Sequence, residues 1–129
     1  MILDTSALMA MLLAEAEGAA FEDLVTRVDG VAMSAATHVE LSIVAAGRLK
    51  PDIWSEMDDL LRRMEVDIIP FTAEHAALAR EGWRRFGKGR HKAGLNLGDC
   101  FAYALARARN EPLLFKGDDF AQTDVKAAI

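Results

Sequence analysis

The stretch Met1-Ile2-Leu3-Asp4-Thr5-Ser6-Ala7-Leu8 opens the chain, and the predicted fold follows from it. Two apolar residues lead into an acid, and two hydroxyl residues precede a run of helix formers. This order predicts a strand, a tight turn and a helix start, with Ser6 or Thr5 as the helix cap. A strand without a polar lead-in is expected in the centre of its sheet. Asp4 would then follow the carboxyl end of that strand, where open α/β sheets bind ligands, although Asp4 alone is more simply interpreted as a turn residue.

Apolar segments alternate with stretches of helical periodicity along the rest of the chain. We predict strands at 2–3, 31–33, 66–69 and 112–115, a short last strand near Val125, and helices at 7–14, 19–28, 34–46, 52–65, 72–86 and 97–109. This alternation indicates a parallel sheet covered by helices on both faces. The chain has 129 residues and no repeat, low-complexity tract or linker, so we expect one domain.

Charge is distributed unevenly along the chain. The net charge is −5, yet the segment 80–92 holds six Lys or Arg and one acid, which gives it a local charge of +5. A concentrated basic segment on an acidic protein is typical of a footprint for nucleic acid, and a solvated helix face with its loop fits equally well. The candidates for contact with a nucleic-acid backbone are Arg84, Arg85, Lys88, Arg90 and Lys92.

The cysteine content and the hydropathy favour a cytoplasmic protein without a membrane partner. Cys100 is the only cysteine, so no internal disulfide is expected, and its apolar neighbours predict a buried packing residue. No basic region precedes an apolar run at the start, and we therefore expect no signal peptide. No apolar stretch approaches the roughly 20 residues of a membrane span.

Four acids stand at predicted strand ends or on predicted helices. Asp4 follows the first strand, Asp99 lies in the first turn of the helix at 97–109, and Asp118 follows the fourth strand. Glu40 lies among apolar residues in the helix at 34–46. Each has a local explanation: Asn96 and Asp99 fit a capping box, Asp118 fits a turn, and Glu40 fits a solvent-facing helix position.

Taken together, the four acids indicate a cation site, because a doubly wound sheet brings strand ends and helix starts to one edge. Clustered carboxylates repel one another, and a hard divalent cation relieves the repulsion. Oxygen ligands in this number suit Mg²⁺ or Mn²⁺, and ions held in this way activate water and stabilise in-line displacement at phosphorus.

Other catalytic patterns fail at a specific residue. The segment 82–88 matches the start of a phosphate-binding loop, but Gly89 stands where Ser or Thr should hold the metal. The histidines lack ligand spacing, and no serine lies in a nucleophile elbow. A phospho-accepting receiver domain needs an aspartate at the end of its third strand, which here ends in Ile69-Pro70.

Four blocks, in order, carry a resemblance to a known family: residues 2–8, 33–41, 87–106 and 113–120. The most specific parts are Leu-Asn-Leu-Gly-Asp99 and Lys-Gly-Asp118-Asp119-Phe. The blocks resemble the PIN-domain ribonucleases and, more narrowly, the VapC-type toxins of bacterial and archaeal toxin–antitoxin pairs. The resemblance covers nearly the whole chain.

The resemblance implies a three-layer α/β/α fold over residues 1–129 and a Mg²⁺- or Mn²⁺-dependent endoribonuclease, the toxin of a type II toxin–antitoxin pair. It also implies a homodimer and a cognate antitoxin that blocks the site. The family's acidic positions, which would be catalytic and metal-binding, fall on Asp4, Glu40, Asp99 and Asp118. Ser6 matches the supporting hydroxyl, and Asp119 adjoins the fourth position, where the family varies.

One alternative from another class stays open, a catalytically inactive PIN-like module that binds RNA or an antitoxin. Such a module is expected to have lost acids, whereas all four are present in this sequence. A metal-dependent cleavage assay on RNA separates the two hypotheses.

Overall fold

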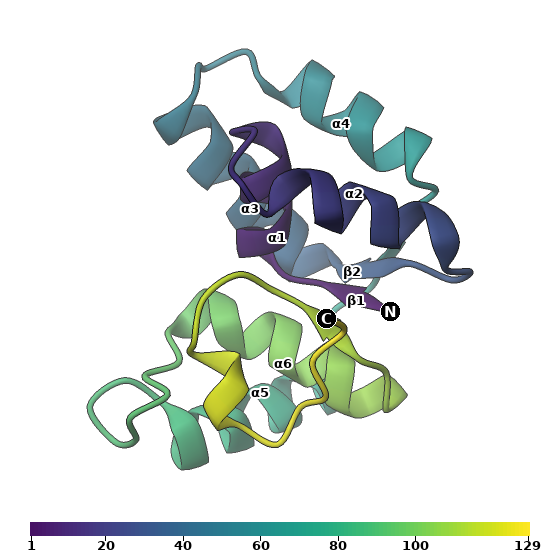
Figure 1. Ribbon diagram of the computed structural model, residues 1–129. Helices are drawn as coiled ribbons and strands as arrows, with labels where there is room; N and C mark the ends of the chain where they lie inside the picture. The colour runs from purple at the N-terminus through teal and green to yellow at the C-terminus, as the bar shows by residue number, and fades with distance from the viewer.

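Four short parallel strands form the middle layer of the structure, a computed structural model that describes all 129 residues (Figure 1). Helices cover the sheet on both faces, as the alternation of strands and helices predicts. The elements in chain order are β1 (Ile2–Leu3), α1 (Thr5–Leu12), α2 (Gly18–Arg27), β2 (Ala32–Ser34), α3 (Ala35–Arg48), α4 (Trp54–Arg63), β3 (Asp67–Ile69), α5 (Ala73–Phe86), α6 (Leu97–Arg109), β4 (Leu113–Leu114) and a 3₁₀ turn (Phe120–Gln122).

The sheet order is β3-β2-β1-β4, which places β1 in the interior as expected. The chain moves outward from β1 through β2 to β3, and β4 then joins the opposite side of β1. The strand order therefore reverses between β1 and β4, and in doubly wound sheets the crevice beyond such a reversal is the usual ligand site. The predicted last strand is reduced to one bridge, between Leu113 and Ala127.

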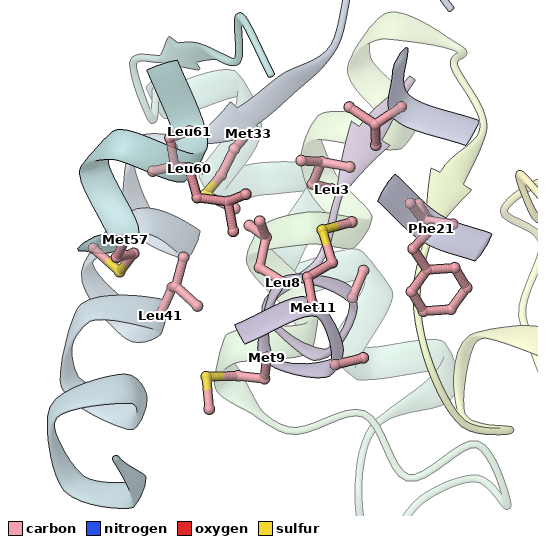
Figure 2. Close-up of a cluster of buried hydrophobic side chains, with 14 of the residues drawn as sticks. Leu3, Leu8, Met9, Met11, Phe21, Met33, Leu41, Met57, Leu60 and Leu61 are labelled. Atoms are coloured by element: carbon pink, nitrogen blue, oxygen red, sulfur yellow. The ribbon is translucent and has the colours of Figure 1, made fainter. Parts of the chain in front are cut away.

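The two faces of the sheet carry separate hydrophobic clusters, because side chains alternate along a strand. Leu3, Met33 and Leu114 face helices α1 to α4, and Figure 2 shows Leu3 and Met33 among the side chains of this cluster. Ile2 and Leu113 face α5 and α6 on the other side of the sheet. Residues of β1, β2 and β4 are buried in these clusters, so the apolar core fixes the ends of these three strands.

Side-chain caps fix most helix starts. Thr72 caps α5 and Asn96 caps α6, as predicted. The prediction that Ser6 or Thr5 caps α1 is wrong, because Asp4 is the cap and its carboxylate accepts from the Ser6 amide. The predicted helix end at Gly47 is also wrong. Helix α3 continues to Arg48, since glycine inside a helix costs only about 1 kcal/mol.

Two further expectations concern burial and membranes. Cys100 is buried and unpaired, as its neighbours predict, and burial raises the pKa of its thiol to about 11. None of the helices combines the length and the apolar character needed to cross a bilayer.

Candidate active site

Asp4 lies at the carboxyl end of β1, beside the point where the strand order reverses. Its side chain is only 3% exposed. Asp4 Oδ2 accepts hydrogen bonds from the Ser6 amide at 2.9 Å and from Ser6 Oγ at 2.5 Å. Ser6 Oγ in turn accepts from the Lys116 amide at 3.0 Å, which ties the end of β1 to the segment after β4. Asp4 Oδ1 is buried and has no hydrogen-bond partner.

Asp99 lies in the first turn of α6, where it forms the capping box that the sequence suggests. Asp99 Oδ2 accepts from the Asn96 amide at 3.0 Å, and the Asp99 amide donates to Asn96 Oδ1 at 2.9 Å. These two bonds hold the Asp99 side chain at the start of the helix. Its other carboxylate oxygen takes no part in the capping box.

Glu40 projects from α3 toward the starts of α1 and α6. Thr5 Oγ1 donates a hydrogen bond to Glu40 Oε1. The other oxygen, Oε2, lies against the backbone of Gly98, so closely that a Cβ atom built on Gly98 would be 1.3 Å from it. Glu40 therefore points inward rather than to open solvent.

A cleft of about 530 Å³ brings Asp4, Glu40 and Asp99 together. Asp118 does not line this cleft and is exposed. The neighbouring Asp119 is also exposed, but its negative charge acts on Asp99. The cleft is lined by Asp4, Thr5, Ser6, Met9, Glu15, Glu40, Val44, Arg48, Asn96, Asp99, Lys116 and Gly117.

Burial and crowding make two of these carboxyl groups unusually weak acids. Burial raises the pKa of Asp4 to about 7, and the charges of Asp99 and Glu40 add to the effect. Burial also raises the pKa of Asp99 to about 6, with further contributions from Asp119 and Glu40. Hydrogen bonds from Ser6 to Asp4 and from Asn96 to Asp99 oppose both shifts. Perturbed acids in a cleft are typical of functional sites.

The donor chemistry of the cleft fits Mg²⁺ or Mn²⁺. Both ions prefer oxygen ligands, and Asp4 Oδ1 is a buried carboxylate oxygen without a partner. Asp4, Glu40 and Asp99 share the cleft, but no three acidic, histidine or cysteine side chains lie close enough together to hold one metal ion between them. Mg²⁺ does not require such a cluster, because it commonly keeps several waters and binds through one or two carboxylates. Asp4 and Asp99 are the residues that could hold such a cation, with Glu40 in the same cleft.

The basic residues of segment 80–92 lie outside the cleft. Arg84 pairs with Glu81, Arg85 pairs with Asp124, and Arg90 stacks on Trp83. Lys88 and Lys92 are exposed and form no ion pair, and with Arg90 they lie in the loop that leads into α6. The base of this loop is closed by a bridge between Gly87 and Leu95.

Sequence reasoning did not assign to the site several residues that contact Glu40 or line the cleft. Thr5 and Gly98 contact Glu40, and Arg48 and Lys116 line the walls. Lys116 also pairs with Glu15. Thr5 and Gly98 each adjoin a predicted acid in the sequence, which was the only available signal. Arg48 lies two turns after Glu40 on α3, but nothing in the sequence alone points it at the site.

Comparison with known proteins shows which family this chain resembles over nearly its whole length. A model of the PIN domain matches residues 1–126. Ribonuclease VapC30 of Mycobacterium tuberculosis is 45% identical over 125 residues, which cover 97% of this chain and 95% of that protein.

Two solved structures share the fold. The structure of VapC20, a sarcin–ricin loop cleaving toxin from Mycobacterium tuberculosis, has a TM-score of 0.76 at 15% identity, covering 96% of this chain and 95% of that one. VapBC2 from Rickettsia felis, bound to a DNA fragment from its promoter, has a TM-score of 0.74 at 19% identity, covering 98% and 94%. The chain belongs to the PIN-domain family, among its VapC-type ribonucleases.

Proposed function

We propose that this protein is the toxin of a toxin–antitoxin pair and hydrolyses RNA phosphodiester bonds with a divalent cation held at Asp4 and Asp99. The observation that carries the proposal is the buried, unpartnered Oδ1 of Asp4, a residue that shares its cleft with Glu40 and Asp99. A buried carboxylate oxygen without a partner is costly unless a ligand satisfies it. The 45% identity to a ribonuclease supports the choice of RNA as substrate.

Each carboxylate has a distinct part in the proposed site. Ser6 fixes the Asp4 side chain through Oδ2 and leaves Oδ1 without a partner, and the capping box fixes the Asp99 side chain through its own Oδ2. When bound there, Mg²⁺ or Mn²⁺ would acidify a water and neutralise negative charge on the phosphate oxygens. Thr5 holds Glu40 through Oε1, and the Glu40 carboxylate is the group that would accept the proton of the attacking water.

The fourth acid comes from the segment after β4. Both Asp118 and Asp119 remain candidates, and Asp119 is favoured because its charge acts on Asp99. Both are exposed, so either side chain is free to turn toward a bound cation.

The phosphate backbone of RNA would contact two groups of Lys and Arg side chains, one in the cleft and one outside it. Arg48 and Lys116 line the cleft itself. Lys88, Arg90 and Lys92 lie on the exposed loop before α6, and Arg84 and Arg85 are weaker candidates because acids already pair with them. Cationic side chains of this kind contribute affinity without reading sequence.

The proposed protein partners are a second copy of the chain and an antitoxin. The proposed location is the cytoplasm. An apolar hollow next to the site is lined by Val39, Ile43 and Leu97, which are 58%, 66% and 72% exposed. Large exposed apolar side chains that gather in this way are typical of interaction surfaces, and a homodimer would cover them. The similarity to the solved VapBC2 structure from Rickettsia felis supports an antitoxin partner.

The test is cleavage of labelled RNA by the purified protein in Mg²⁺, in Mn²⁺ and in chelator. We expect cleavage only with metal, and Asp99→Asn should lower the rate at least ~10²-fold, as for other groups that stabilise a transition state. Asp29→Asn, at an exposed turn, is the matched control and should cleave normally. If the parent cleaves RNA in neither Mg²⁺ nor Mn²⁺, the chain is an inactive PIN-like module.

A further inference from the structure

Gly98 leaves no room for a side chain of its own while the Glu40 carboxylate lies where it does. It lies buried in the first turn of α6, directly before Asp99. A Cβ atom built on Gly98 would lie 1.3 Å from Oε2 of Glu40, 2.2 Å from its Cδ and 2.7 Å from its Oε1. The Glu40 carboxylate therefore occupies the volume that a side chain at position 98 would fill.

We propose that Gly98 is a positioning residue for Glu40: the missing side chain creates the space in which the Glu40 carboxylate lies beside Asp4 and Asp99. This inference rests on the proposed function. Glu40 is held from two sides, by the Thr5 hydroxyl and by the bare Gly98 backbone. The Gly98 side of this arrangement is purely steric.

A methyl group at position 98 would move Glu40 rather than disrupt the helix. The atoms that it meets belong to the end of a flexible side chain, which can rotate into the cleft at low cost. Alanine also suits a helix better than glycine does. Gly98→Ala should therefore fold, lose the contact between Thr5 and Glu40, and carry Glu40 in a place where it cannot assist the reaction.

Two other helical glycines provide matched controls. A Cβ atom at Gly47 in α3 meets nothing within 4 Å, so Gly47→Ala should retain both folding and activity. A Cβ atom at Gly82 in α5 would lie 2.5 Å from the Tyr103 ring, so Gly82→Ala should lower the melting temperature. Because Gly82 is remote from the cleft, its variant should bind Mn²⁺ normally when folded.

The experiment is a double-mutant cycle between positions 98 and 40. Gly98→Ala, Glu40→Ala and the double variant are compared with the parent for RNA cleavage and for Mn²⁺ affinity by calorimetry. Each single variant should lose about 10–100-fold in cleavage, the range seen when partners that orient metal-site groups are removed. Any change in Mn²⁺ affinity should be the same in both single variants. The double variant should be no worse than Glu40→Ala, because position 98 acts only through Glu40.

The outcomes separate this inference from the proposed function. A parent that neither cleaves RNA nor binds Mn²⁺, or a fully active Glu40→Ala variant, refutes the proposed site and this inference with it. A Glu40→Ala loss that Gly98→Ala does not reproduce refutes the role of Gly98 alone. Losses that add in the double variant also refute it, since they would show that Gly98 acts independently of Glu40. If Gly98→Ala does not fold, a Gly98→Ala/Glu40→Ala variant that also does not fold overturns the inference, and one that folds supports it.

Discussion

Replacing Asp4 by asparagine should remove a loss of stability that the metal-free parent undergoes as the pH rises, so that the variant gains stability relative to the parent. Asp4 is 3% exposed, and burial raises its pKa from 3.8 to about 7. A raised pKa means that the folded state favours the protonated acid. The stability that this proton contributes is complete below about pH 4 and is lost as the pH rises through 7. Asparagine does not titrate and loses nothing over this range.

The magnitude follows from the size of the shift. One pKa unit corresponds to about 1.4 kcal/mol, so the parent should lose roughly 2–3 kcal/mol relative to Asp4→Asn between pH 5 and pH 8. For a domain of this size, about 3–5 °C per kcal/mol gives a change on the order of 10 °C in the difference between melting temperatures. The amide leaves a buried N–H unpaired at the position of Oδ1, but this cost is the same at every pH.

The assay is thermal unfolding of parent and variant in chelator at pH 5, 6, 7 and 8, with the exposed turn variant Asp29→Asn as control. A parent-to-variant difference in melting temperature that stays constant from pH 5 to pH 8 would refute the reasoning. Adding Mn²⁺ at pH 8 should restore the parent by about 2.7 kcal/mol at a hundredfold excess over the dissociation constant. Asp4→Asn should gain much less, because its amide is a poorer ligand for the cation.

Two further predictions concern substrate binding and the support of the site. Replacing Lys88, Arg90 and Lys92 by alanine should weaken RNA binding at all sequences. In filter-binding measurements, the slope of log affinity against log salt concentration should become shallower by roughly 0.7 per lost phosphate contact. An unchanged slope would show that the loop does not contact RNA. Ser6→Ala should lower Mn²⁺ affinity about 10–100-fold in calorimetry, because Asp4 loses a hydroxyl donor and the Lys116 amide loses its acceptor. Parent-like Mn²⁺ affinity in Ser6→Ala would show that Asp4 needs no such support.

The layers of the fold could be predicted from the sequence because burial imposes periodicity. Helical spacing predicted the bounds of α5 and α6 to within one residue, and the apolar opening of the chain predicted β1 as an interior strand. Exact boundaries were harder to predict, because several residues compete for one cap. At the start of α1, Asp4, Thr5 and Ser6 could all accept from a first-turn amide, and only the backbone conformation at Asp4 decides between them.

The candidate site was predictable where an acid follows a strand or opens a helix. Asp4 and Asp99 meet because the reversal of strand order brings their elements to one edge. The fourth acid was not predictable, because the segment after β4 has no periodicity and Gly117 turns the chain there with φ of +98°. The contacts of Glu40 with Thr5 and Gly98 join three helices, and no local pattern in one sequence encodes such a meeting.

Asp4 and Asp99 can each cap a helix and still serve the proposed site, because a carboxylate has two oxygens. Asp4 uses Oδ2 to cap α1 and retains Oδ1, and Asp99 uses Oδ2 to complete the cap of α6. Capping fixes each side chain in one orientation before any ligand arrives, so no rotamer entropy remains to be lost on binding. A helix cap at a strand reversal is therefore a means of presenting one carboxylate oxygen in a defined place. The capping motif in Asn96 to Asp99 should count in favour of a site at this edge, rather than against it.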